Sequence, residues 1–211
     1  DILIAGAGAA GLMAAASAPT GAKVVILEKN AQPGRKILAS GNGRCNLTNT
    51  NLSPEHYNGS QPFLSAVLPR FTCKDATVFF ENLGVVLKEE TDGRIFPRCG
   101  RAGTVGEALA LAASERGATL MKANIVSARK NGEIFEIKTE EGKTFPAKKL
   151  ILACGSPASP QLGGAECGIR LAASLGHSVC GMKPALVPLL VKERGIKRLK
   201  GVRVDAALKA L

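Results

Sequence analysis

The chain has 211 residues, of which 45% are hydrophobic and 21% charged, and 24 are glycines. This composition is typical of a soluble α/β protein that buries its own core, and it excludes an intrinsically disordered chain. No apolar run reaches the roughly 20 residues that cross a bilayer, so we expect a cytoplasmic protein without a membrane partner.

The formal net charge of +11 is unevenly distributed along the chain. Eight lysines and arginines lie between Lys183 and Leu211, against only Glu193 and Asp205. Such a basic terminal segment either binds nucleic acid or is the solvated face of an incomplete domain. We favour the second interpretation and expect a small-molecule substrate as the partner. The sequence does not indicate an oligomeric state.

The six cysteines stand at scattered positions, with no CxxC pair and no histidine cluster beside them. Structural zinc and iron–sulfur sites require such groupings, so we expect no metal site. A chain long enough to form its own core does not depend on disulfides, and we expect reduced thiols.

The N-terminal part of the chain predicts a β-α-β unit. Residues 2–5 and 24–27 are short apolar runs, which are typical of buried parallel strands. Between them, residues 9–17 are rich in alanine and end before Pro19 and Gly21, as expected of a helix.

The middle of the chain begins with a long loop. Residues 29–60 are mostly Gly, Asn, Ser, Thr and Pro, a composition that predicts a functional loop. Helices are then expected over 61–69 and 74–83, with Thr72 as the N-cap of the second. They are followed by a hairpin of 85–89 and 94–97 that turns at Asp92-Gly93, and by a helix over 104–116.

The last part of the chain predicts more strands. Apolar and polar residues alternate over 119–128, 134–139 and 143–145, with turn signals at Asn131-Gly132 and Glu141-Gly142, which predicts a three-stranded antiparallel meander. A buried strand over 150–153 and a helix over 168–175 follow. The order of elements predicts an α/β fold of the Rossmann type, with a parallel sheet, helices and a three-stranded antiparallel meander.

Gly6, Gly8 and Gly11 form a GxGxxG motif that follows the first strand and opens the first helix. In this motif the first glycine permits a tight turn, the second lets the backbone approach a pyrophosphate, and the third lets the helix pack on its strand. Glu28 ends the next strand, 17 residues after Gly11, where a carboxylate accepts hydrogen bonds from ribose hydroxyls. The motif predicts a dinucleotide site, but by itself it does not separate FAD from NAD.

Two features favour FAD. The meander between the helix at 104–116 and the strand at 150–153 resembles the crossover of glutathione-reductase-type FAD domains, whereas dehydrogenases usually place a helix there. The sequence Leu152-Ala153-Cys154-Gly155 resembles the strand-end ATG motif of those domains, with Cys154 in place of threonine.

The most distinctive part of the sequence is the segment 34–49, GRKILASGNGRCNLTN, which combines fixed cations, glycines and amide side chains. Such groups can surround a phosphate or the edge of a flavin. Cys45 lies beside Arg44 in this segment, without a neighbouring cysteine to act as its redox partner, so we expect a packed small residue rather than a catalytic thiol.

Together with DGRIFP at 92–97, Gly176-His177 and PALVPL at 184–189, this segment closely resembles a bacterial family of NAD(P)/FAD-dependent, aminoacetone-oxidase-like flavoproteins. The resemblance implies bound FAD, with reduced nicotinamide as a possible electron donor. It also implies an FAD-binding Rossmann-like domain over 1–184, the start of an inserted second domain over 185–211, and a chain that stops before the FAD domain is completed.

The motifs and the resemblance together define the candidate cofactor-binding residues. They are Gly6, Gly8, Ala9, Ala10, Gly11, Glu28, Lys29, Arg35, Lys36, Ser40, Gly41, Gly43, Arg44, Cys45, Asn46, Val126, Ala153 and Gly155. The cations among them, Arg35, Lys36 and Arg44, are expected to contact phosphate or to stabilise an anionic reduced flavin. No residue is assigned as a catalytic acid or base.

The expected function is that of an FAD-dependent oxidoreductase, in which reduced nicotinamide or a small substrate exchanges a hydride with the flavin. Two alternatives stay open. One is a nucleic-acid-associated protein that uses the nucleotide fold as a scaffold and the basic stretch 192–203 as its contact. The other is an NAD-only dehydrogenase, which would bind nicotinamide without flavin.

Overall fold

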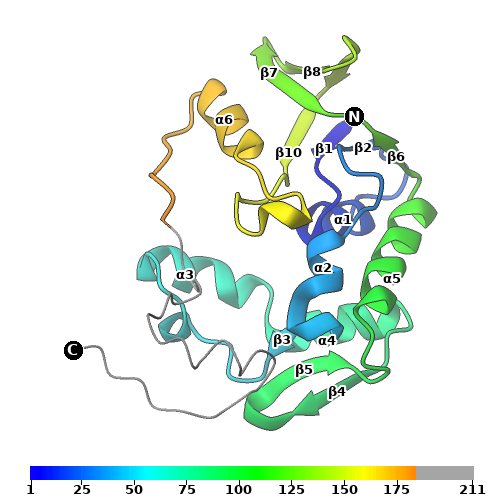
Figure 1. Ribbon diagram of the computed structural model, residues 1–211, viewed down its shortest axis with the longest axis vertical. Coiled ribbons are helices and arrows are strands. Elements are labelled where there is room, and N and C mark those ends of the chain that lie inside the picture. The colour runs from blue at the N-terminus through cyan, green and yellow to red at the C-terminus, as the bar shows by residue number, and fades with distance from the viewer. Residues whose placement is uncertain (184–211) are drawn as a thin grey trace, which may run out of the picture. The chain divides into compact units, whose positions relative to one another are not determined.

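Four parallel strands form the central sheet, in the order β10-β1-β2-β6 (Figure 1). They are β1 (Ile2–Ala5), β2 (Val24–Glu28), β6 (Ala118–Lys122) and β10 (Lys149–Leu152). The computed structural model describes residues 1–183, and one compact unit, Asp1–Val179, contains every helix and strand of that range. The second domain expected over 185–211, the basic stretch and the PALVPL sequence lie outside the described residues.

The two central strands, β1 and β2, are covered on both faces, and their side chains alternate between these faces. Ile4 and Ile26 point to the face covered by α1 (Ala9–Ala16) and α5 (Ala102–Glu115). Leu3 and Leu27 point to the opposite face, where the antiparallel meander and α6 (Cys167–Ser174) pack. The two apolar layers explain why strands β1 and β2 read as continuous apolar runs rather than as alternating ones.

The meander consists of β7 (Ile125–Asn131), β8 (Ile134–Thr139) and β9 (Thr144–Ala147). The prediction of a single strand over 119–128 was wrong, because this segment is divided between two sheets. Its first part, β6, pairs in parallel with β2, and the Ala123 N–H still donates to the Glu28 carbonyl (2.9 Å). The Asn124 carbonyl then accepts from Glu140 N–H (2.8 Å), which begins the meander. Both parts keep the alternating pattern, so the pattern does not mark the break.

The segment 29–60 is more ordered than the predicted loop. It contains the short helix α2 (Arg35–Ala39), turns of 3-10 helix at Ser40–Gly43 and Pro54–His56, and the strand β3 (Thr48–Asn49). β3 pairs with β5 (Arg94–Pro97), which pairs with β4 (Leu87–Glu90). The predicted hairpin is thereby confirmed, with Thr91–Gly93 as its turn, and it gains a third strand from the loop.

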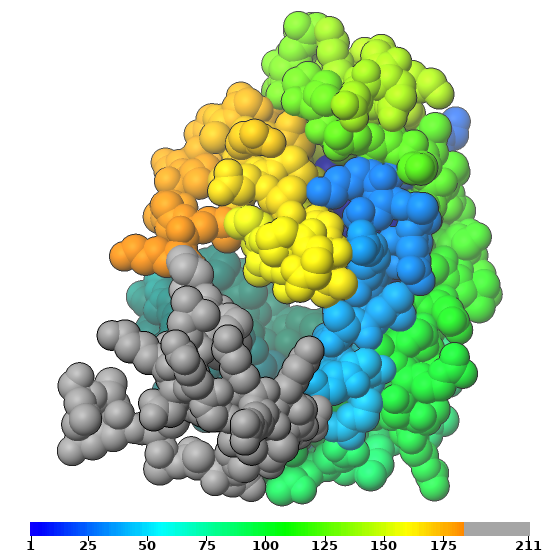
Figure 2. Space-filling view, in the orientation of Figure 1, coloured from blue at the N-terminus to red at the C-terminus, as the bar shows by residue number. Residues whose placement is uncertain are grey.

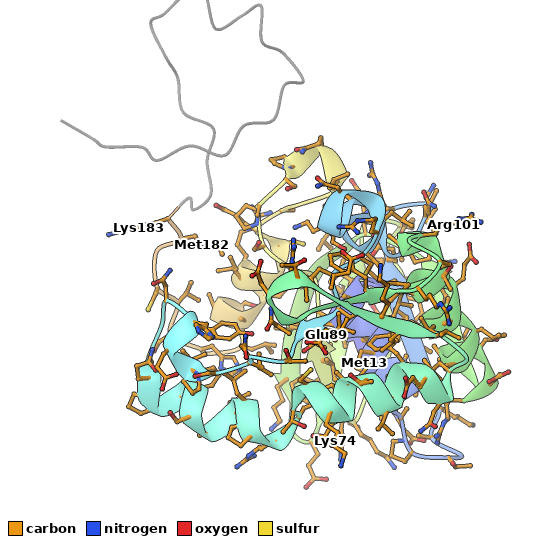
Figure 3. The ribbon with its side chains drawn as sticks, turned by 90° about the horizontal axis from the view of Figure 1, so that it is seen from below. Met13, Lys74, Glu89, Arg101, Met182 and Lys183 are labelled. Atoms are coloured by element: carbon orange, nitrogen blue, oxygen red, sulfur yellow. The ribbon has the colours of Figure 1, made fainter. Side chains whose placement is uncertain are left out.

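Two helices connect β3 to the hairpin, as predicted. They are α3 (Gln61–Val67), extended by a 3-10 turn at Leu68–Arg70, and α4 (Cys73–Asn82). The expected cap of α4 is confirmed, because Thr72 and Asp75 form a capping box in which each side chain accepts from the other's backbone N–H. Figure 3 shows α4 with its exposed Lys74 at the start of the helix.

None of the helices within residues 1–183 has the length and apolar character that a membrane crossing requires.

The capping box predicts a measurable effect on stability. Thr72→Ala removes the side-chain acceptor of the Asp75 N–H, so we expect the free energy of unfolding in urea to fall by about 1 kcal/mol. Thr72→Ser keeps a hydroxyl in the same place and serves as the control, with a much smaller loss. Equal losses in the two variants would mean that the threonine methyl group, and not the hydrogen bond, stabilises this helix start.

Candidate functional site

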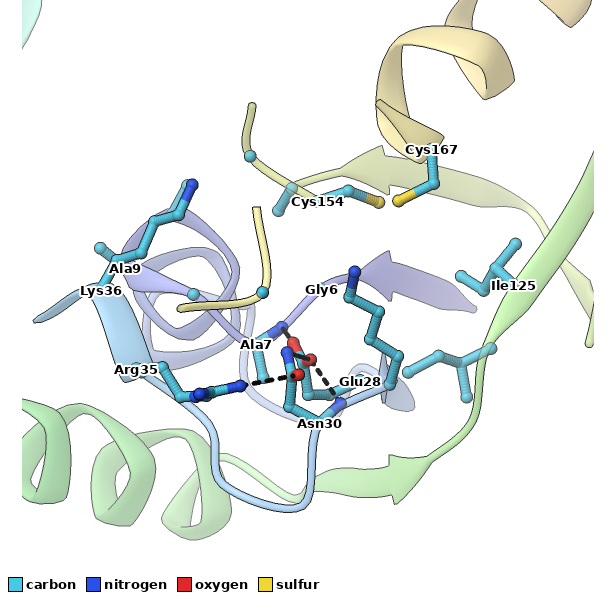
Figure 4. Close-up of a pocket in the computed structure, with 18 of the residues that line it drawn as sticks. Gly6, Ala7, Ala9, Glu28, Asn30, Arg35, Lys36, Ile125, Cys154 and Cys167 are labelled. Carbon is cyan, nitrogen blue, oxygen red and sulfur yellow. Dashed lines mark hydrogen bonds between the residues drawn. The ribbon is translucent and has the colours of Figure 1, made fainter. Parts of the chain in front are cut away.

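A cavity of about 470 Å³ lies at the carboxyl ends of β1, β2 and β10, where parallel sheets with helical crossovers bind their ligands (Figure 4). The first turn of α1, the start of α2, the β6–β7 junction and the start of α6 complete its wall. Ten of the predicted cofactor-binding residues line it: Gly6, Gly8, Ala9, Ala10, Glu28, Lys29, Arg35, Lys36, Ala153 and Gly155.

The glycine turn at the base of this cavity has no room for side chains at two of its three positions. Gly6 adopts a φ of 104°, and a Cβ there would lie 2.6 Å from the Ala153 carbonyl oxygen. A Cβ on Gly11 would collide with the Gly6 carbonyl. Gly8 differs, because a Cβ there would meet no atom within 4 Å, although Gly8 lines the cavity. The first and third glycines therefore fix the fold, and the second leaves open space beside the backbone.

The N-terminus of α1 opens into the cavity. No side chain caps the helix at Gly8, and Gly8, Ala9 and Ala10 all line the cavity. The first N–H groups of a helix have no partner within the helix, and they carry the positive end of its dipole. This end of α1 is therefore suited to a phosphate group.

Glu28 is held in the cavity wall, close to the start of α1, by the protein's own hydrogen bonds (Figure 4). Its Oε2 accepts from the Ala7 N–H (2.7 Å), and its Oε1 accepts from the Asn30 N–H (2.8 Å) and from Asn30 Nδ2 (2.6 Å). A carboxylate oxygen has two acceptor sites, so Oε1 is saturated by these contacts and Oε2 retains one site. Glu28 can still accept a hydroxyl of a ligand.

Arg35 and Lys36 reach across the cavity to the segment 156–163. Lys36 Nζ donates to the Ser156 carbonyl (3.0 Å), and Arg35 donates to the Gln161 carbonyl (2.9 Å) and to Asn30 Oδ1 (3.3 Å). In the space-filling view the segment near residue 160 (yellow) lies against the segment near residue 35 (blue) (Figure 2). The two cations line the cavity as predicted, and they also anchor this segment.

The predicted residues of the 40–46 turn form a second cluster outside the cavity lining. Arg44 makes an ion pair with Glu90 (2.9 Å) and lies over the Phe96 ring, 4.2 Å from its centroid. Gly41 also approaches Phe96, and the Asn46 side-chain amide faces the carbonyls of Ile95 and Thr48. The cluster holds the turn against the β3–β5–β4 sheet. Ser40, Gly43 and Cys45 belong to the same turn.

Cys45 is only 6% exposed and packs in the core beneath α5. Burial raises the pKa of its thiol, and the hydrogen bond with Ser40 only partly opposes this. A redox or nucleophilic cysteine needs a lowered pKa and access, so the burial supports the packing interpretation.

Two further predicted residues lie beside the cavity rather than in its wall. Gly11 lies in the first turn of α1 and packs against the Gly6 carbonyl. Val126 is 56% exposed and sits at an irregularity in the β7–β8 pairing, next to Ile125, which does line the cavity.

The sequence reasoning missed several cavity residues. Asn30 was not identified, although it lies two residues after Glu28 and holds the Glu28 carboxylate. Ala123, Asn124 and Ile125 follow the end of a parallel strand, a rule that would have found them had the break after β6 been recognised. Cys167 comes from α6, far along the chain, and no local signal points to it.

The strand order, the glycine turn and the cavity at the strand ends define a Rossmann-type nucleotide-binding domain. The chain belongs to the HI0933-like protein Rossmann domain family, whose model matches residues 1–205. This membership confirms the family resemblance that the sequence motifs indicate.

Two curated relatives match almost the whole chain. A 3-dehydro-bile acid delta(4,6)-reductase of Clostridium scindens is 39% identical over 212 residues, which are 99% of this chain and 52% of the relative. A ribosomal RNA dihydrouridine synthase of Escherichia coli is 31% identical over 217 residues, which are 100% of this chain and 54% of the relative. The chain thus spans about half the length of the curated relatives it matches.

Among solved structures, the open conformation of a flavocytochrome c3 fumarate reductase shares the fold. It has a TM-score of 0.63 and 18% sequence identity, and the match covers 84% of this chain and 40% of that one.

The Glu28 contacts predict a cost for losing one carboxylate oxygen. Glu28→Gln places an amide group, which cannot accept, against the Ala7 or Asn30 N–H, so we expect the free energy of unfolding in urea to fall by about 1–3 kcal/mol. Glu107→Gln on the exposed side of α5 is the matched control and should change it by less than about 0.5 kcal/mol. If the two variants lose the same amount, the Glu28 network does not stabilise the fold.

Proposed function

We propose that this chain is the FAD-binding portion of a flavin-dependent oxidoreductase. The observation that carries the proposal is the presence of two complementary groups in the wall of one cavity: the uncapped N-terminus of α1 at Gly8 and the Glu28 carboxylate, which has an acceptor site to spare. The first suits a pyrophosphate and the second suits a ribose, which are the two polar parts of an ADP group. Bound FAD would supply hydride transfer.

The residues that would hold the ADP half are those of the cavity. In our proposal Gly6, Gly8, Ala9 and Ala10 contact the pyrophosphate, and Glu28 with Lys29 contacts the ribose. Gly11 supports this contact by letting α1 pack closely on the turn at Gly6, and Val126 is assigned to the adenine end of the site. Arg35 and Lys36 add positive charge to the same cavity, which favours an anionic ligand.

The flavin half is assigned to the remaining predicted residues. Ala153 and Gly155 follow the end of β10 in the cavity wall. Lys36 lies in α2, and this helix leads directly into the turn with Ser40, Gly41, Gly43, Arg44, Cys45 and Asn46. The role proposed for this turn is to present its backbone to the isoalloxazine. The ion pair of Arg44 with Glu90 gives the turn the rigidity for that role.

The names of the two relatives suggest the reaction class. Delta(4,6)-reduction of a bile acid and formation of dihydrouridine both add hydrogen to a carbon–carbon double bond. We propose the same class here, with reduced nicotinamide as the electron donor. Anaerobic mixing of the flavin-loaded protein with NADH or NADPH should bleach the flavin absorbance, and an alkene substrate should restore it. Absence of bleaching with both donors would rule out nicotinamide as the reductant.

Gly8 provides the sharpest test of cofactor binding, because alanine fits there without a ligand. Its φ of −78° suits any residue, and a Cβ meets no atom within 4 Å. In the protein containing this chain, Gly8→Ala should leave the thermal midpoint nearly unchanged but weaken FAD binding about tenfold or more, since the Cβ occupies the approach to the pyrophosphate. The measurement is titration of FAD followed by the shift of its visible absorbance.

Gly106→Ala in α5 is the control for that experiment. A Cβ at Gly106 also meets no atom within 4 Å, and the residue is not part of the cavity lining, so FAD affinity should stay as in the unsubstituted protein. A protein that remains colourless with added FAD, yet binds nicotinamide dinucleotide, would instead establish the NAD-only dehydrogenase.

A second candidate is an oxidoreductase of the same class that acts on RNA. It is favoured by the two ribosomal RNA dihydrouridine synthases, of Escherichia coli and Haemophilus influenzae, at 31% and 32% identity, and by the net charge of +11. Lysines and arginines that neutralise phosphates make affinity fall steeply with salt. Binding of ribosomal RNA that weakens between low and physiological salt would support this substrate, and no binding at low salt would exclude it.

A further inference from the structure

Two cysteines meet in the wall of the cavity, on the side away from Glu28 and Asn30 (Figure 4). Cys154 lies two residues beyond the end of β10, and Cys167 is the first residue of α6. Both are partly buried free thiols, and both line the cavity. In Figure 4 their sulfur atoms point toward one another, although the residues come from separate elements.

The packing of α6 on the end of β10 brings the two thiols together. A Cβ on Gly168 would lie 2.8 Å from the Cys154 Cβ and 3.5 Å from its sulfur, so only glycine permits this approach of the helix. Cys154 Sγ also donates to the Ala5 carbonyl (3.3 Å), which fixes the side chain against β1. Cys167, next to Gly168, is thereby held beside a sulfur that has little freedom to turn away.

We propose that Cys154 and Cys167 form a dithiol site that a peroxide oxidises reversibly to a disulfide. The proposal goes beyond the proposed function and does not depend on it, because it rests on the positions of the two thiols and needs no flavin. Of the other cysteines, Cys45 is buried in the core beneath α5, and Cys99 and Cys180 are exposed. The juxtaposition singles out one pair that a small oxidant can reach through the cavity.

The oxidation has two balanced steps. The sulfur of Cys167 attacks the peroxide, the O–O bond breaks, and a sulfenic acid and one water are formed. The sulfur of Cys154 then attacks that of Cys167, the S–O bond breaks, and a disulfide and a second water leave. Together the two thiols lose two electrons and two protons, and the peroxide takes them up.

The environment of Cys154 determines which of the two thiols attacks the peroxide first. Burial, and then the neighbouring Cys167, raise the pKa of the Cys154 thiol to about 12, so Cys154 stays protonated at neutral pH. Because the thiolate is the form that reacts with a peroxide, Cys154 reacts with it slowly, and the first attack is assigned to Cys167. Once Cys167 carries the sulfenic acid, however, the Cys154 sulfur is already in position.

The formation of this disulfide can be tested on a single tryptic peptide. Trypsin cleaves after Lys149 and Arg170, and no lysine or arginine lies between them, so both cysteines fall in the single peptide Leu150–Arg170. The protein is treated with hydrogen peroxide, denatured in acid, alkylated, digested and analysed by mass spectrometry. We expect this peptide to lose two hydrogen masses and both alkyl labels, and to regain both labels after treatment with dithiothreitol.

Three variants act as controls. Cys167→Ser should leave Cys154 fully alkylated after peroxide, and Cys154→Ser should leave Cys167 as a sulfenic acid that dimedone traps. Cys73→Ser, which removes a partly buried thiol outside the cavity lining, should form the disulfide as the unsubstituted protein does. The proposal is overturned if the peptide keeps both labels while the exposed Cys99 and Cys180 are oxidised, or if either cysteine of the pair is found linked to a different one.

Discussion

The structure depends on a contact between backbone atoms where β1 passes into α1. The Gly6 carbonyl lies where a side chain on Gly11 would stand, and the Ala153 carbonyl lies against Gly6. The end of β1, the start of α1 and the segment after β10, which is distant in the sequence, therefore touch without intervening side chains. This contact sets the height at which α1 begins above the sheet, and so the N–H groups of its first turn face the carboxyl ends of β2 and β10.

The remaining elements position the groups that surround this turn. Because β2 lies beside β1 in register, Leu27 pairs with Ala5 and Glu28 lies one residue beyond, where its carboxylate reaches the Ala7 N–H. β10 on the other side of β1 brings Ala153 and Cys154 to the same edge. Two apolar layers bury β1 and β2 between them, so the packing of the core determines the positions of the strand ends that form the site.

Motifs whose residue types are required by the local backbone conformation were predictable from the sequence. The GxGxxG turn, the position of Glu28 and the Thr72 cap each follow from a local requirement that only a few residue types meet. The break between β6 and β7 was not predictable, because strands in different sheets share the same alternating pattern.

Contacts of side chains with residues far away in the sequence were equally unpredictable. Arg35 and Lys36 were recognised as cations of the site, but their contacts with carbonyls more than a hundred residues later were not, and neither was the meeting of Cys154 with Cys167. Arg44 stood in the most specific segment of the sequence, yet its partners, Glu90 and Phe96, lie in a hairpin that no local pattern connects to it.

The anchoring of the segment 156–163 has a consequence for any anion that enters the cavity. Lys36 and Arg35 already donate to the Ser156 and Gln161 carbonyls, so an incoming anion has an internal competitor for each cation. The free energy gained at these positions is the difference between two hydrogen-bonded arrangements, not the full strength of one. An anion that displaces both carbonyls also removes the hydrogen bonds that hold the segment 156–163. Binding of an anion in the cavity is therefore coupled to the mobility of this segment.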